Sequence, residues 1–136
     1  MNFRLKKRSP WFTAIVLVAI GIFTFTVGSV AVRFAETSFT INATGGAIEV
    51  PYQKISEVEY RETNINGRRS FGIGTMKINS GRFTNEEFGD YTLYAYTSVK
   101  PVIVVHHSDN MVLVFNLKTV EETRSAYETL RDYWGK

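Results

Sequence analysis

A stretch of 22 residues, from Trp11 to Val32, contains no charged side chain and no proline. As an α-helix it would be about 33 Å long, close to the ~30 Å hydrocarbon core of a bilayer. The stretch therefore predicts a transmembrane helix over residues 11–32, preceded by a basic tail at residues 1–10. A cleaved signal peptide is the alternative. The length favours an uncleaved anchor, because the apolar cores of signal peptides usually run about 7–15 residues.

The distribution of charge predicts the orientation of this helix. The apolar stretch is preceded by four basic residues, Arg4, Lys6, Lys7 and Arg8, and all 13 acidic residues of the chain follow it. The more basic flank of a membrane helix usually stays in the cytoplasm. We therefore expect a protein of the cell membrane with a cytoplasmic N-terminus and an extracytoplasmic domain at residues 33–136. That domain carries 12 basic and 13 acidic side chains, a net charge of −1. A near-neutral domain argues against a nucleic-acid partner.

Residues 33–136 are enough for one hydrophobic core, and their patterning predicts mainly β-structure. Apolar and polar residues alternate in some segments, while others are continuously apolar and predict strands buried on both faces. Asn66-Gly67 is a strong signal for a two-residue hairpin turn, and Ser108 to Asn110 predicts a tight turn. The predicted strands cover residues 38–43, 47–52, 55–61, 90–97, 101–107 and 111–116, with two short or bulged strands within 71–84.

A single amphipathic helix is predicted at the C-terminus. Thr119 and Glu122 have the spacing of a capping box, in which a threonine and a glutamate satisfy free amides of the first turn. Gly135 is the expected C-cap. The fold class is therefore mainly β, a barrel or orthogonal sandwich of about seven strands capped by a C-terminal α-helix. The helix has one apolar stripe, formed by Val120, Thr123, Tyr127, Leu130 and Trp134.

Several segments from Asn66 onward resemble a family of bacterial membrane-associated proteins with a pleckstrin-homology-like (PH-like) domain. The resemblance is carried by residues 71–74 (FGIG), 80–83 (SGRF), 91–96 (YTLYAY) and 101–105 (PVIVV), together with the final helix. It covers about half of the chain by motif and the soluble part by architecture. It implies a PH-like barrel attached to a bacterial membrane, and it brings no catalytic residues, because this fold hosts many functions.

One departure from eukaryotic PH domains bears on lipid binding. Those domains bind headgroups with basic residues around the first hairpin. Here that hairpin is expected at Asn42 to Gly46, which contains no lysine or arginine. Phosphoinositide binding is therefore disfavoured, because phosphate capture needs cations or a nest of amides.

No pattern predicts a catalytic site, a cofactor or a metal. The chain has no cysteine, and no serine, histidine and aspartate have the arrangement of a triad. His106, His107 and Asp109 are the most metal-like cluster. Adjacent residues of a strand point to opposite faces, however, so the two histidines do not readily share one ion. We therefore expect no enzyme and no metal centre.

Two sets of residues are candidates for binding a partner. The first is a basic patch around the second hairpin, although its simpler interpretation is a solvated tip balanced by Glu62, Glu86 and Glu87. The second is a tyrosine face on one strand, which is exposed only if Leu93 and Ala95 form the core side. The candidate residues are Arg61, Arg68, Arg69 and Arg82 for an anionic ligand, and Tyr94 and Tyr96 for a protein.

These expectations lead to two functional hypotheses. In the first, the chain is a single-pass membrane protein that acts through contact with a protein partner or by self-association as a homo-oligomer. In the second, the domain binds an anionic ligand or an envelope polymer through its arginines, and salt weakens this binding. The anchor and the missing catalytic groups favour the first hypothesis.

Overall fold

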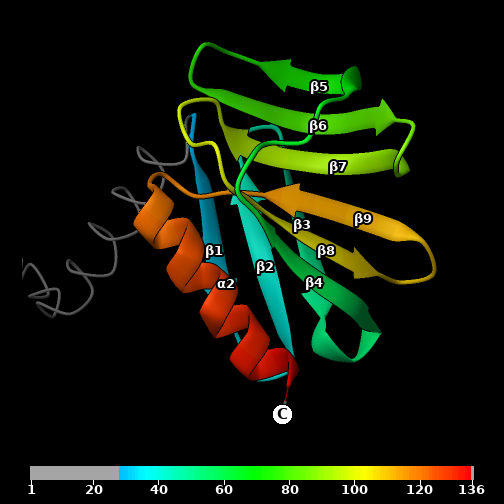
Figure 1. Ribbon diagram of the computed structural model, residues 1–136, viewed down its shortest axis with the longest axis vertical. Coiled ribbons are helices and arrows are strands. Elements are labelled where there is room, and N and C mark those ends of the chain that lie inside the picture. Colours follow the sequence, from blue (N-terminus) through cyan, green and yellow to red (C-terminus); the bar gives the residue numbers. More distant parts are fainter. Residues whose placement is uncertain (1–27, 136) are drawn as a thin grey trace, which may run out of the picture.

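The computed structural model describes residues 28–135, which form nine strands, one 3₁₀ turn and one α-helix (Figure 1). The mainly β architecture with a C-terminal helix confirms the predicted class, although the described strands number nine rather than about seven. The elements are β1 (Val30–Phe34), β2 (Ser38–Ala43), β3 (Gly46–Pro51), η1 (Tyr52–Lys54), β4 (Ile55–Arg61), β5 (Arg68–Gly74), β6 (Ile78–Asn85), β7 (Gly89–Tyr96), β8 (Val102–His107), β9 (Met111–Phe115) and α2 (Val120–Trp134).

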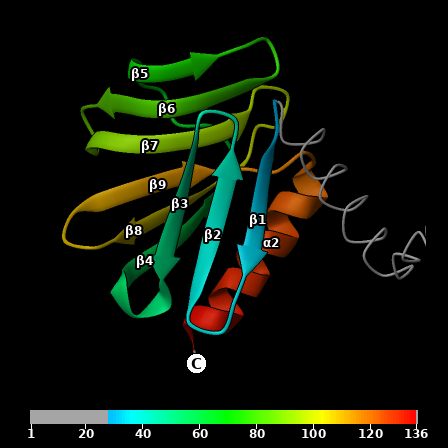
Figure 2. The same ribbon diagram turned by 180° about the vertical axis from the view of Figure 1, so that it is seen from behind.

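The strands form two open sheets that pack as a sandwich (Figures 1 and 2). Strands β1, β2 and β3 form an antiparallel sheet in chain order. The larger sheet has the order β4-β8-β9-β7-β6-β5, and all its pairs are antiparallel except β7 with β9. The bulge between Ile55 and Glu57 puts Ile55 and Val58 on the core side of β4 despite their odd spacing.

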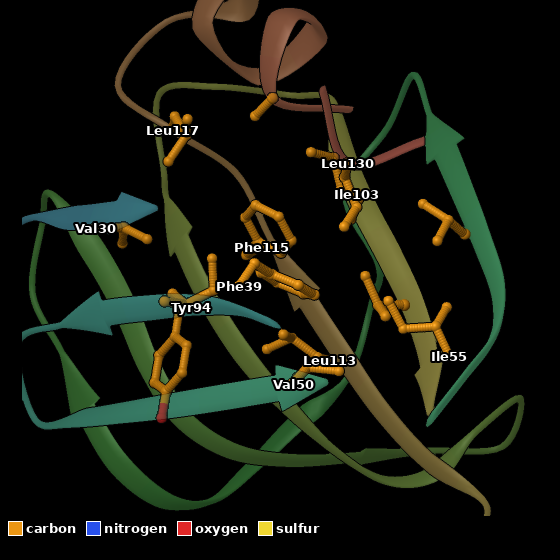
Figure 3. Close-up of a cluster of buried hydrophobic side chains, with 14 of the residues drawn as sticks. Val30, Phe39, Val50, Ile55, Tyr94, Ile103, Leu113, Phe115, Leu117 and Leu130 are labelled. Atoms are coloured by element: carbon orange, nitrogen blue, oxygen red, sulfur yellow. The ribbon is translucent and has the colours of Figure 1, made fainter. Parts of the chain in front are cut away.

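Hydrophobic clusters cover both faces of the larger sheet. In β8, Ile103 and Val105 point into one cluster, while Val102 and Val104 point into the other. The first cluster lies between the two sheets and α2, and includes Phe39, Ile41, Leu113, Phe115 and Leu130 (Figure 3). The second cluster is smaller and is partly covered by Ile65 and Phe88. The prediction of strands buried on both faces is therefore confirmed.

Helix α2 begins and ends at the predicted residues. The amide of Glu122 donates to Thr119 Oγ1 at 3.1 Å, so the threonine part of the predicted capping box forms. Gly135 donates its amide to Arg131 O, but its φ of −77° is right-handed, so its backbone does not require glycine. Thr123, Ala126 and Leu130 are the buried residues of the helix. Val120 was wrongly placed on the buried stripe, because its first-turn position leaves it 41% exposed.

The predicted transmembrane helix, at residues 11–32, extends too far toward the C-terminus. Val30, Ala31 and Val32 belong to β1 and pair with Ala43, Asn42 and Ile41 of β2. Val30 is buried in the main core, so its apolar character belongs to the domain rather than to a membrane span. The rest of the predicted helix and the basic tail lie outside the described residues. Within residues 28–135, no helix has both the length and the apolar character needed to cross a bilayer.

The predicted hairpin at Asn66-Gly67 is wrong. Strands β4 and β5 flank this dipeptide, but they lie at opposite edges of the larger sheet and do not pair. Residues 62–67 form a crossing connection instead, held where Asn85 Nδ2 donates to Asn66 O at 3.1 Å. Gly67 has a packing role, because a Cβ there would collide with the hydroxyl of Tyr91. The turn at Ser108 to Asn110 is confirmed, and all three residues have positive φ.

Candidate functional site

Arg61 ends β4 and is held between two carboxylates. Its guanidinium donates to Glu87 Oε2 and to Glu59 Oε2, each at 3.0 Å, and lies 5.3 Å from the centre of the Phe88 ring. The hydrogen bonds to Glu87 raise the pKa of Arg61, and in turn Arg61 lowers the pKa of Glu87. Arg61 therefore has a structural partner and is not a free cation for an anionic ligand.

A polar groove of about 580 Å³ lies beside Arg61. It is bounded by the connection at residues 62–67 and by the residues that join β6 to β7, including Asn85, Glu86 and Glu87. Two carboxylates and one cation line it, and that cation is already paired. The groove therefore lacks the excess of positive charge that an anion site needs.

The structure does not bring the remaining arginines into one patch. Arg69 lies opposite Phe83 in the β5–β6 pair, with its guanidinium 5.8 Å from that ring, and it donates to Asn79 Oδ1 at 3.1 Å. Arg82 lies opposite Phe71 and is exposed. Successive residues of a strand alternate between faces, so Arg69 and Arg82 lie on opposite faces of the sheet. Arg68 is exposed at the start of β5, close to Glu86.

Tyr94 and Tyr96 do not form an exposed aromatic face. They are 7% and 5% exposed and belong to the main core, while Leu93 and Ala95 belong to the second cluster. The expectation of a tyrosine partner site is therefore wrong, because both faces of β7 are covered. The hydroxyl of Tyr96 instead accepts from the amide of Val30 at 3.1 Å and thereby helps to hold the start of β1.

His106 and His107 separate as expected for neighbours on a strand. The ring of His106 packs edge-on against Phe88, and His107 is 5% exposed with its Nδ1 3.1 Å from Ser108 Oγ. Burial is the main factor that lowers the pKa of His107, and the neighbouring His106 adds to it. Within residues 28–135, no three histidine, aspartate or glutamate side chains are grouped to hold a metal ion.

The most accessible apolar residues lie on β5 and in the turn that follows it. Every residue of β5 is exposed, and Phe71, Ile73 and Met76 are 77%, 42% and 99% exposed. Large apolar side chains that gather on an exposed edge often mark an interaction site. The sequence places strands here, but it does not single out these residues as a surface. The available signal is the glycine run at Gly72, Gly74 and Gly81, which leaves few side chains to cover the strand.

Comparison with family models matches residues 30–116 to the bacterial PH domain, from the first residue of β1 to just beyond β9. The chain belongs to the bacterial PH domain family. The predicted PH-like resemblance is thereby confirmed, and α2 follows the matched region of this PH domain. Comparison with curated proteins gives no match, and comparison with solved structures gives none.

The hairpins of this PH domain bear on the expectation about phosphoinositides. The first described hairpin is β1–β2, one hairpin earlier than expected, because β1 occupies residues assigned to the membrane helix. Its turn, at residues 35–37, contains Glu36 and neither lysine nor arginine, and the β2–β3 turn at Thr44-Gly45 is uncharged. That phosphoinositide binding is disfavoured stays a prediction, now based on both turns.

Proposed function

We propose that this PH domain is a membrane-anchored, non-catalytic module that binds an extended segment of a partner protein along β5. The anchor is the uncharged stretch from Trp11 to the residue before Gly28, whose 17 residues are at the short end of the ~17–25 that span a bilayer as a helix. The domain is extracytoplasmic by the charge distribution of the sequence. The observation that carries the proposal is that every residue of β5 is exposed and that, among the described strands, this edge strand pairs only with β6. An unpaired strand edge offers main-chain donors and acceptors to an incoming strand.

The other sheet edges are less available among the described strands. Strands β1, β3 and β4 each contain buried residues, whereas every residue of β5 is exposed. The edge at β4 is also blocked locally, because Trp134 Nε1 donates to Ile55 O at 3.2 Å. Strand β5 is therefore the edge with the fewest obstacles to a partner.

The chemistry of β5 indicates the kind of segment it would bind. Arg68 and Arg69 lie at the start of the strand, and the bulge beside Arg69 disfavours pairing there. Phe71 to Gly74 carries no charge and has two exposed apolar side chains. A suitable partner segment has apolar residues against Phe71 and Ile73 and an acidic residue near Arg68.

A second copy of the chain fits β5 less well than a different protein. Strand β5 runs toward the end of the domain where Gly28 lies. Gly28 contacts Thr44, and the next residue, Gly45, lies beside Ile73 near the end of β5. Two copies anchored in one membrane therefore present β5 in the same direction. An antiparallel pair of identical β5 strands would place one of the two Gly28 residues away from that membrane.

Site-specific photocrosslinking in native membranes tests the proposal. A photoreactive amino acid is placed at Ile73 in the full chain, and Met111, which is 47% exposed on β9, receives it as a matched control. We expect a discrete adduct from position 73 and none from position 111. Introducing Phe71→Asp should abolish the adduct, because a charge in the middle of an edge strand opposes pairing.

The adduct and the membrane fraction provide the outcomes that would contradict the proposal. Equal adducts from both positions, or an adduct that persists with Phe71→Asp, would exclude β5 as the site. An adduct of twice the 15.5 kDa chain mass would show that the occupant is a second copy. Extraction of the full chain from membranes by alkaline carbonate would refute the anchor.

A further inference from the structure

Four segments far apart in sequence meet at one end of the domain (Figure 1). The amide of Gly28 donates to Thr44 Oγ1 at 2.5 Å, and a methyl group on the next residue, Gly45, would lie 3.0 Å from Ile73 Cδ1. In the β5–β6 turn, Met76 O accepts from Thr97 Oγ1 at 2.6 Å. We call this end the tip, formed by residues 28–29, 44–45, 75–77 and 97–100.

The tip combines an exposed apolar side chain with exposed cations. Met76 is 99% exposed, Lys77 follows it in the same loop, and Lys100 is exposed on the loop that Thr97 begins. Thr97 joins these loops a second time, through its amide and Lys77 O at 3.0 Å. The four segments contain no aspartate or glutamate. A fully exposed methionine, with exposed lysines on the same loop and on the loop connected to it, suits a surface with an apolar layer beneath an anionic one.

The opposite end of the same hairpin, unlike the tip, contains carboxylates. Strand β6 runs from Ile78, next to the tip, to Asn85, and is followed by Glu86 and Glu87. Asp90 follows shortly in β7. At that end Arg61 pairs with Glu87 and Arg68 lies close to Glu86, so charges of both signs are present there, whereas the tip carries cations alone.

The course of the chain identifies what lies at the tip. Gly28 directly follows the uncharged sequence that begins at Trp11. A membrane that holds that sequence is covalently close to the tip, because consecutive Cα atoms are only about 3.8 Å apart. The tip is thus the part of the domain nearest to the bilayer surface, and this step rests on the anchoring in the proposed function.

We propose that the tip docks on an anionic phospholipid surface, with Met76 in the interfacial layer and Lys77 and Lys100 against headgroup phosphates. The contact orients an already anchored domain and does not target it. With the tip on the bilayer, β5 rises away from the membrane and its open edge faces along the membrane plane. The ligand chemistry is general phosphate charge, because the two lysines stand on separate loops and each offers one exposed ammonium group.

Fluorescence depth measurement on the full chain tests this docking. The chain has no cysteine, so Met76→Cys carries an environment-sensitive probe at one position, and Glu86→Cys is the matched control at the far end of the hairpin. Each variant is reconstituted into vesicles of phosphatidylcholine with one quarter phosphatidylglycerol. A nitroxide on a shallow acyl position acts as the quencher.

We expect at least a threefold greater quenching at position 76 than at position 86. The difference should fall by half or more in pure phosphatidylcholine, and also with Lys77→Glu and Lys100→Glu together. Equal quenching at the two positions in vesicles that retain the chain after alkaline washing would overturn the docking and leave the anchor intact. Loss of the chain from the washed vesicles would instead refute the anchoring, and with it both proposals.

A protein at the tip gives a different result. In that case the probe at position 76 would be shielded from aqueous iodide in native membranes but not in pure lipid vesicles. That outcome would overturn the lipid assignment. Both substituted residues are exposed, so neither variant should disturb the core, and circular dichroism of the reconstituted chain checks this.

Discussion

Gly72 and Gly81 lie directly opposite each other in the β5–β6 pair, so close that neither position has room for a side chain. Their φ angles are +134° and +143°, a region that favours glycine. A Cβ on Gly72 would lie 2.1 Å from Ser80 O and 2.6 Å from Gly81 Cα. The close backbone contact at this pair holds β5 onto the sheet with few side-chain contacts.

Replacing Gly81 with alanine should therefore release β5. We expect a loss of about 1–3 kcal/mol in the free energy of unfolding, from the strained φ and the collision with Phe71 O. In this variant the hydrogen-exchange rate should increase much more for the amides of β5 than for those of β8. Ser70→Ala, on the same strand and exposed, is the control and should change stability by less than about 0.5 kcal/mol. Unchanged β5 protection in Gly81→Ala would contradict this account.

Asn116 should be the most sensitive polar residue of the domain. It is fully buried, and its Nδ2 donates to Val99 O at 2.8 Å and to Pro101 O at 3.2 Å, while its Oδ1 accepts from the amide of Tyr96 at 2.6 Å. Asn116→Asp turns the donor into an acceptor facing carbonyl oxygens. We expect a loss of about 3 kcal/mol or more, measured by urea unfolding. Asn64→Asp, on an exposed loop, should be nearly neutral, and equal losses would refute the role of Asn116.

The pairing of Arg61 with Glu87 predicts a measurable carboxyl titration. Arg61 lowers the pKa of Glu87, mainly through the hydrogen bonds between them. Arg61→Met should therefore raise the pKa of Glu87 toward its usual value, as followed by carbon NMR of the side chain. Lys118→Met, which removes an exposed cation outside this pair, is the control variant and should leave the pKa of Glu87 low. A pKa of Glu87 that does not move in Arg61→Met would mean that the ion pair does not persist in solution.

Burial of His107 predicts a stability that depends on pH. Its pKa is lowered in the folded domain, so the unfolded chain takes up a proton more readily. The free energy of unfolding should hold above pH ~6.5 and fall as the pH decreases toward the folded-state pKa. The slope from one proton cannot exceed about 1.4 kcal/mol per pH unit. Thermal melts of His107→Gln should lose this slope while His106→Gln retains it; the same slope in both variants would contradict the assignment.

The sequence predicts most of the fold where local signals and burial agree. The alternation in residues 38–43 and the apolar runs of β8 and β9 give the strands, and the Thr119 cap gives the start of α2. Strand β1 is missed because its core-facing residues, Val30 and Val32, are as apolar as those of a membrane helix. The Asn66-Gly67 signal is misleading, since tertiary pairing of β4 with β8 overrides the local turn preference.

The candidate site is predicted less well, because residue type does not reveal the direction of a side chain. The four arginines are close in sequence, but alternation along β6 and the bulge in β5 distribute them, and Glu87 pairs one of them. Tyr94 and Tyr96 share a face as expected, yet that face is interior because a second sheet covers it. Exposure at Phe71 and Met76 depends on which strand ends the sheet, and that order is not encoded locally.

The order of the larger sheet also determines when it can form during synthesis. Strands β8 and β9 join β4 to the rest of the sheet, and Val58 of β4 must wait for Val105 before it has a neighbour. A ribosome therefore releases the sheet's outer strands before its centre exists. Such distant pairings slow folding, and they leave the earlier strands open to aggregation until the last third of the chain emerges.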